Sequence, residues 1–118
     1  MSAAGKRYAR AAVEAAMGNG GIEAVQKLSE GLGRFRDAYV QSSELREVLS
    51  NPALKDVRES VLRAILTKLD TSTETVNLVL ILAENDRVGA LDDVAQDIHA
   101  IADEKAGRLR ALVKSAIA

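Results

Sequence analysis

Residues 75–91 read TVNLVLILAENDRVGAL, where a strongly apolar helical segment stops abruptly at ENDR and a second helical pattern begins at once. At about 100° per residue, the apolar side chains cover well over half of the helix circumference. They are Val76, Leu78, Val79, Leu80, Ile81, Leu82 and Ala83. A surface helix of a small domain needs an apolar stripe only about 100° wide. The surplus apolar arc predicts a second apolar partner, which is a neighbouring helix of this chain or a helix of another protein.

Length and composition exclude several classes of function. The 118 residues suit one domain with a single core, and the absence of Cys removes disulfides, thiol nucleophiles and thiolate metal sites. Sixteen basic and seventeen acidic residues, with neither sign in a block, do not form the basic face of a nucleic-acid binder. The apolar run is shorter than the roughly twenty residues that span a bilayer. We therefore expect no nucleic-acid partner and no direct membrane insertion.

Apolar residues recur three or four apart nearly throughout, with one Pro and few Gly, so the expected fold class is all-α, a single compact six-helix bundle. The expected helices cover about 3–17, 22–40, 44–49 and 54–69, followed by a fifth that opens at the Thr71 cap and stops near Glu84, and a sixth that runs from about 88 past 109. GNGG at residues 18–21 is expected to close the first helix as a loop. Asp56 with Glu59, and Thr71 with Glu74, are placed as capping pairs for the fourth and fifth helices. Glycines at 31 and 33 predict a soft point within the second helix, each costing about 1 kcal/mol against Ala.

The first helix also has two apolar faces. Ala9, Val13, Ala16 and Met17 form one face, and Ala4, Tyr8, Ala11 and Ala15 form the other. Two faces imply two partners, and small alanines beside one tyrosine would let another helix approach closely. An alanine-rich helix in the middle of the bundle is the alternative interpretation.

The inventory of catalytic and metal-binding groups is thin. His99 can pair with Asp103 one turn on, but without Cys or a second His it cannot complete a nitrogen or sulfur metal site. The GNGG stretch lacks the Lys-Ser/Thr partner and preceding strand of a phosphate-binding loop. The five acids between Asp92 and Glu104 are interpreted as a solvated helix face instead of a carboxylate metal site. We expect no catalytic residue, no cofactor-binding residue, no cofactor and no metal.

Four short sequences, taken in order and spacing, resemble one known family. They are YARA at residues 8–11, SELR at 43–46 followed by LSNP at 49–52, NL at 77–78 followed by AENDRV at 83–88 and Leu91, and VKSA at 113–116. Together they resemble the N-terminal domain of the delta subunit of F-type ATP synthases, called the oligomycin-sensitivity-conferring protein in mitochondria. No single sequence is diagnostic, but the order over the whole chain is specific.

The resemblance implies a non-catalytic peripheral-stalk (stator) subunit that sits on the F1 head of the ATP synthase. In that family a groove between the first and fifth helices takes the N-terminal helix of an alpha subunit, which is helix-in-groove recognition. Carried over, the groove residues are Tyr8, Ala11 and Ala15 on one wall, Leu78, Ile81 and Leu82 on the other, and Asn85 at the rim. Val76, Val79 and Ala83 would then face the core, although spacing alone also allows the opposite assignment.

The resemblance also implies domain bounds for this chain and a location in the cell. Residues 1–112 correspond to the helical head-binding domain and 113–118 to the start of a linker, so the family's C-terminal domain, which contacts b-type stalk subunits, would begin where this chain stops. The implied location is the cytoplasmic face of the bacterial inner membrane, or the mitochondrial matrix or chloroplast stroma side. Two departures from the family pattern are noted. Ala12 and Val13 are smaller than the usual pair, and Leu80 is expected to be an exposed apolar residue.

A function of another class remains open from the residues themselves. A helical RNA-binding or regulatory module has a similar bundle shape, and an enzyme ranks third. The balanced charge argues against RNA binding, and a salt-dependent nucleic-acid shift would support it.

Overall fold

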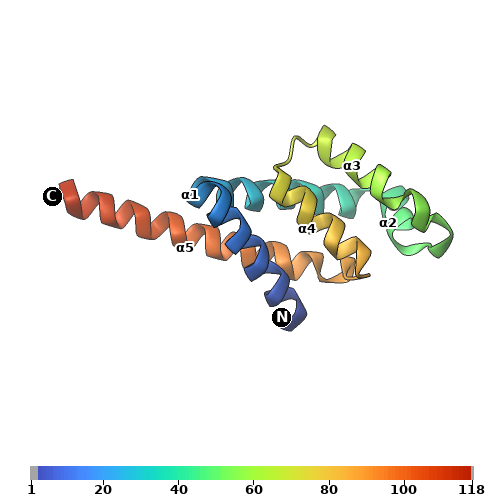
Figure 1. Ribbon diagram of the computed structural model, residues 1–118, viewed down its shortest axis with the longest axis horizontal. Coiled ribbons are helices and arrows are strands. Elements are labelled where there is room, and N and C mark those ends of the chain that lie inside the picture. The colour runs from blue at the N-terminus through green and yellow to red at the C-terminus, as the bar shows by residue number, and fades with distance from the viewer. Residues whose placement is uncertain (1–2, 118) are drawn as a thin grey trace.

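The computed structural model describes residues 3–117, and its first element is a long bent helix, α1 (Ala3–Gln41). The bend lies at Gly21, whose φ of 69° and ψ of −152° fall in a region that is essentially restricted to glycine. Gly21 therefore divides α1 into an N-terminal arm, residues 3–20, and a C-terminal arm, residues 22–41. Figure 1 shows the two arms running in different directions.

Six further elements follow α1. They are α2 (Ser43–Ser50), the 3₁₀ helix η1 (Pro52–Val57), α3 (Arg58–Lys68), α4 (Thr73–Glu84), the 3₁₀ helix η2 (Val88–Ala90) and α5 (Leu91–Ile117). Residues 3–117 contain no strand, so the all-α prediction is confirmed. The predicted count of six helices is corrected to five α-helices. The helix continues through Gly20, so the expected GNGG loop shrinks to a bend at one residue and the first two expected helices are the arms of α1.

Two predicted caps are also corrected. Ser72, not Thr71, caps α4, because the backbone N–H of Thr75 donates to Ser72 Oγ at 3.3 Å. The hydroxyl of Thr71 instead donates to the Leu66 carbonyl at 3.1 Å, at the end of α3. Thr71 thus satisfies a carbonyl at the end of α3, and Ser72 caps the start of α4.

The Asp56–Glu59 pair does not cap the fourth expected helix, because that helix begins earlier as a 3₁₀ segment. Asn51 caps η1 by accepting from the Ala53 N–H at 2.9 Å, and Pro52 occupies the first position, where no N–H is needed. α3 then starts at Arg58 without a side-chain cap. The signal at Asn51-Pro52 therefore ends α2 and starts the next helical segment.

The core lies where α1 packs against α5 and α4, with α3 packed on the other side of α4. Its fully buried large side chains include Val25, Leu28, Leu32, Phe35, Leu62, Leu66, Leu82, Val94 and Ile98. These come from α1, α3, α4 and α5, and α2 adds Leu45 and Leu49. One contiguous core therefore holds all five α-helices together, as the single-bundle prediction requires.

The last turns of α5 extend away from the bundle (Figure 1). The described chain measures 60 × 29 × 25 Å and has a radius of gyration of 15.4 Å. A compact domain of this length has about 13.5 Å. We call residues 107–117 the α5 tail. The predicted domain boundary between residues 112 and 113 falls inside this tail, and residues 1, 2 and 118 of the predicted domains lie outside the described residues.

Candidate partner-binding face

The N-terminal arm of α1 has one buried face and one exposed apolar face. Ala9, Val13 and Ala16 are buried in the core. Ala11 and Ala15 are exposed, and Tyr8 is half-buried at the boundary between the two faces. Within each face the residues recur three or four positions apart, as they do on one side of a helix.

Met17 departs from the expected pattern of this arm. It is expected on one apolar face with Ala9, Val13 and Ala16, which are buried, but 37% of its own surface is exposed. At about 100° per residue it lies some 40° beyond Val13, toward the polar side of the helix. The buried residues of the arm are therefore Gly5, Ala9, Val13 and Ala16, without Met17.

The orientation of α4 separates its apolar side chains into two groups. Val79 is 2% exposed and Ala83 8%, while Ile81 is 44% exposed. Val76 is half-buried against the core. The apolar arc of α4 is therefore wider than the part that packs into the core, because Ile81 remains on the solvent side.

Leu78 and Leu82, both expected on the groove wall, lie in the core at 4% and 1% exposure. α4 packs against both α1 and α3, so its buried arc is centred on Thr75 and Leu82 and is wide enough to take in Leu78. The exposed part of the expected α4 wall is reduced to Ile81 and Asn85. Asn85 caps the helix, and its Nδ2 donates to the Ile81 carbonyl at 3.0 Å.

A shallow hollow of about 340 Å³ lies between the N-terminal arm and Arg87 in the turn that follows α4. It is lined by Ala4, Arg7, Tyr8, Ala11 and Arg87. Two of these, Tyr8 and Ala11, belong to the expected groove. The two arginines were missed in the sequence analysis, although Arg87 stands in the ENDR stop of the apolar helix.

Arg58 ties the loop after α4 to the other half of the bundle. It is 8% exposed, and its Nε and Nη2 donate to the carbonyls of Val48 at 2.8 Å and Asn51 at 3.1 Å. Its Nη1 lies 3.6 Å from Oδ1 of Asp86, a residue with a left-handed φ of 54°. Nothing in the spacing of the sequence singles out Arg58, which donates to the carbonyls at the end of α2 and pairs with the exposed carboxylate of Asp86.

Leu80 is not the exposed apolar residue that we expected. It is half-buried and lines a cleft of about 260 Å³ between α3 and α4 together with Leu62 and Arg58. The cleft belongs to the side of α4 away from Ile81. The α3–α4 contact, which the sequence did not specify, explains the difference.

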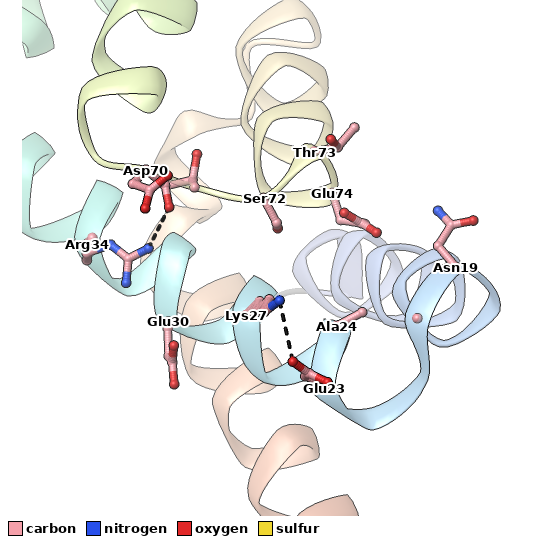
Figure 2. A pocket seen from close by; sticks show the side chains of 12 residues that line it. Asn19, Glu23, Ala24, Lys27, Glu30, Arg34, Asp70, Ser72, Thr73 and Glu74 are labelled. Atoms are coloured by element: carbon pink, nitrogen blue, oxygen red, sulfur yellow. Dashed lines mark hydrogen bonds and ion pairs between the residues drawn. The ribbon is translucent and has the colours of Figure 1, made fainter.

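A second hollow lies where the bend of α1 faces the first turn of α4 (Figure 2). Its two cationic side chains have partners, because Lys27 lies 3.5 Å from a carboxylate oxygen of Glu23 and Arg34 donates to the carbonyls of Leu69 and Asp70 at 3.1 Å. Asn19 and Gly20 of the GNGG stretch border it as part of a helix, not as a phosphate-binding loop. This hollow holds no nucleophile with a base.

His99 lies on the surface of α5. Its Nε2 is 3.4 Å from Oδ2 of Asp103, and its Nδ1 is 3.4 Å from Ser29 Oγ. The side chains of His99 and Asp103 are both more than two-thirds exposed. Within residues 3–117 no group of three His, Cys, Asp or Glu side chains is placed to hold a metal ion.

Comparison with known proteins assigns the family. The family model described as ATP synthase delta (OSCP) subunit matches residues 4–118. The chain belongs to the ATP synthase delta (OSCP) subunit family. The resemblance predicted from the four short sequences is thus confirmed.

Several relatives carry the name ATP synthase subunit delta. One from Anaeromyxobacter sp. (strain Fw109-5) is 34% identical over 118 residues, which cover 99% of this chain and 64% of the relative. One from Myxococcus xanthus (strain DK1622) is 34% identical over 114 residues, covering 94% and 61%. One from Geobacter sp. (strain M21) is 30% identical over 117 residues, covering 98% and 63%. This delta-family chain therefore spans a little under two thirds of the length of these relatives.

No solved structure gives a significant match to the chain. A search of the helices within residues 3–117 finds none that is both long and apolar enough to cross a bilayer.

Proposed function

We propose that this delta-family chain is a non-catalytic stator component of an F1Fo ATP synthase, and that its role is to hold the F1 head to the peripheral stalk. A rotary synthase needs this attachment, because torque from the central shaft would otherwise turn the whole head instead of driving ATP synthesis. The family membership and the relatives named ATP synthase subunit delta support the proposal. The head is the direct partner, and b-type stalk subunits are reached through the C-terminal domain of the family.

The observation that carries the proposal is the exposure of Ile81 beside the fully buried Val79 on α4. A branched aliphatic side chain at 44% exposure in the last turn of α4 is available for a partner without any change in the core. Ala11 and Ala15 offer a second exposed apolar strip on the N-terminal arm, with Tyr8 half-buried beside them. We propose that these side chains form the groove that receives the N-terminal helix of an alpha subunit.

The rim of this groove adds a charge requirement. Arg7 and Arg87 border the hollow at one end of the groove, and Asn85 lies in the turn between Ile81 and Arg87. Guanidinium groups at the rim of an apolar site favour carboxylates on the partner and raise the association rate. We propose that the bound helix places an acidic residue between Arg7 and Arg87.

The proposed location follows from the complex. A head-bound delta-family chain lies at the periphery of F1Fo, on the cytoplasmic face of a bacterial inner membrane, or on the matrix or stroma side in a eukaryote. It needs no cofactor and no metal of its own for this role, because attachment requires only complementary surfaces.

The test is calorimetric titration with a peptide covering the N-terminal helix of the alpha subunit from Myxococcus xanthus or Anaeromyxobacter. Ala11→Asp should weaken binding about tenfold or more, because a carboxylate opposite an apolar helix is desolvated without a partner. The matched control is Ala64→Asp, an exposed alanine in the middle of α3. If the unchanged chain does not bind the peptide, or if both variants lose binding equally, the groove assignment is wrong.

A further inference from the structure

The α5 tail exposes large apolar side chains far from the proposed groove. Leu109 is 45% exposed, Leu112 69%, Val113 49% and Ile117 81%. The helix remains continuous to Ile117, and Figure 1 shows it leaving the other elements behind. The large apolar residues of the tail therefore lie outside the core and keep about half or more of their surface exposed.

These residues continue a stripe that is buried in the bundle. Ile98, Ala102 and Ala106 are 0%, 5% and 8% exposed, and Leu109 and Val113 follow them at helical spacing. Leu109, Val113 and Ile117 line one continuous shallow hollow along the tail. The same face that packs against α1 thus runs on for almost three turns without a partner among the described residues.

The tail is basic as well as apolar. Arg108, Arg110 and Lys114 are its charged residues, and all seventeen acidic residues of the chain precede the tail. Arg108 pairs with Glu104 in the preceding turn, whereas Arg110 and Lys114 make no ion pair among the described residues. At about 100° per residue, Arg110 and Lys114 flank one edge of the apolar stripe and Arg108 flanks the other. Arg110 and Lys114 also border the hollow itself. An apolar stripe with cationic edges matches a helix that has an apolar stripe with anionic edges.

Two other occupants fit these features less well. A second copy of the tail would bring cation against cation along both edges, which disfavours pairing. Helices that lie on a lipid surface carry Trp, Phe or Leu on the apolar face and many Lys or Arg residues, whereas residues 107–117 have two leucines, three cations and no Phe, Tyr or Trp. Helix pairing needs only the aliphatic stripe and the charged edges that the tail has.

We propose that the α5 tail docks an acidic amphipathic helix of another protein, at a site separate from the groove of Ala11 and Ile81. Two attachment surfaces on one small domain would let it bridge two partners. The tail lies outside the core, so changes in it should not alter folding of the bundle. This separation also makes the proposal independent of the groove assignment.

The test uses two synthetic helical peptides of about three heptads with Leu at the a and d positions. One carries Glu at the e and g positions and the other carries Lys. The Glu peptide should bind in calorimetry, with an affinity that falls as salt rises, and the Lys peptide should not. Leu109→Ser with Val113→Ser should abolish binding, while Ala111→Ser, on the opposite face of the tail, should leave it unchanged.

Three results would overturn the proposal. Equal binding of the Glu and Lys peptides would remove the charge argument. Binding of the chain to phosphatidylglycerol vesicles, without binding of the Glu peptide, would make the tail a membrane-surface helix. A dimer in sedimentation that is lost in the Leu109→Ser, Val113→Ser variant, with no Glu-peptide binding, would make the occupant a second copy. Circular dichroism of each variant checks that the bundle is folded.

Discussion

A Cβ atom placed on Gly31 would lie 2.8 Å from Oγ1 of Thr75 and 3.2 Å from its Cγ2. Gly31 is buried on the C-terminal arm of α1, and Thr75 is fully buried in the first turn of α4. The Thr75 hydroxyl is also bound to Ser72 Oγ at 3.0 Å, so it has little freedom to move. The glycine interpreted as a soft point of the helix is therefore a position where α4 crosses α1 too closely to leave room for a Cβ.

This contact predicts opposite effects for the two glycines of the C-terminal arm. Gly31→Ala should lower the free energy of unfolding by about 1–3 kcal/mol, because the added methyl overpacks the crossing. Gly33→Ala meets nothing within 4 Å and should raise it by about 0.5–1 kcal/mol through higher helix propensity. Urea unfolding followed by circular dichroism measures both. Equal stability of the two variants would contradict a close crossing at Gly31.

The bend of α1 makes a second prediction. Gly21→Ala should destabilise the fold by about 1–3 kcal/mol, because φ of 69° with ψ of −152° strains any residue that has a Cβ. Gly18→Ala is the control within the same stretch, since its position is open and has no positive φ. It should be neutral or slightly stabilising in thermal unfolding. A Gly21→Ala variant that melts like Gly18→Ala would show that the bend is not required.

The buried Arg58 makes a third prediction. Arg58→Met removes the donors to the Val48 and Asn51 carbonyls and should cost about 1–3 kcal/mol, the usual range for buried polar groups left without a partner. Arg63→Met removes only an exposed pair with Glu59 at 3.9 Å, which is worth at most about 0.5 kcal/mol. Denaturant midpoints distinguish the two. Similar losses in both variants would mean that Arg58 acts only as a surface charge.

Sequence reasoning predicted the helical fold and the existence of surplus apolar faces, because both depend on spacing along the chain. Periodicity placed Val79 and Ile81 on different sides of α4 but could not say which side is buried. That choice depends on α1 and α3, which pack against α4 from distant parts of the sequence. The family resemblance correctly placed Val79 and Ala83 on the buried side of α4. Leu78 and Leu82 are buried as well, so fewer α4 side chains than expected are exposed on the proposed groove wall.

The features that sequence reasoning missed are all tertiary. In the sequence, Arg58 is indistinguishable from a surface arginine, and its role depends on the end of α2, where it donates to the Val48 carbonyl. Gly31 has low helix propensity in the sequence, and its role depends on the approach of Thr75 from α4. Arg7 and Arg87 are eighty positions apart and share a hollow only in the folded chain. The last helix was expected to run past Leu109 without a predicted end, and the structure shows α5 as far as Ile117.

A fourth prediction concerns the two faces of α4. Val79→Asp should lower thermal stability before any partner is added, because it places a carboxylate in the core. Ile81→Asp should leave the free chain folded, because that side chain is 44% exposed. Ala83→Asp should behave like Val79→Asp, since Ala83 is also buried.

The most direct test of the proposed groove is the affinity of Ile81→Asp for the alpha-subunit N-terminal peptide, measured by calorimetry on protein shown to be folded by circular dichroism. The groove on the exposed side of α4 predicts a native-like melting curve and at least about a tenfold loss of affinity. A folded Ile81→Asp variant that binds the peptide as tightly as the unchanged chain would contradict it.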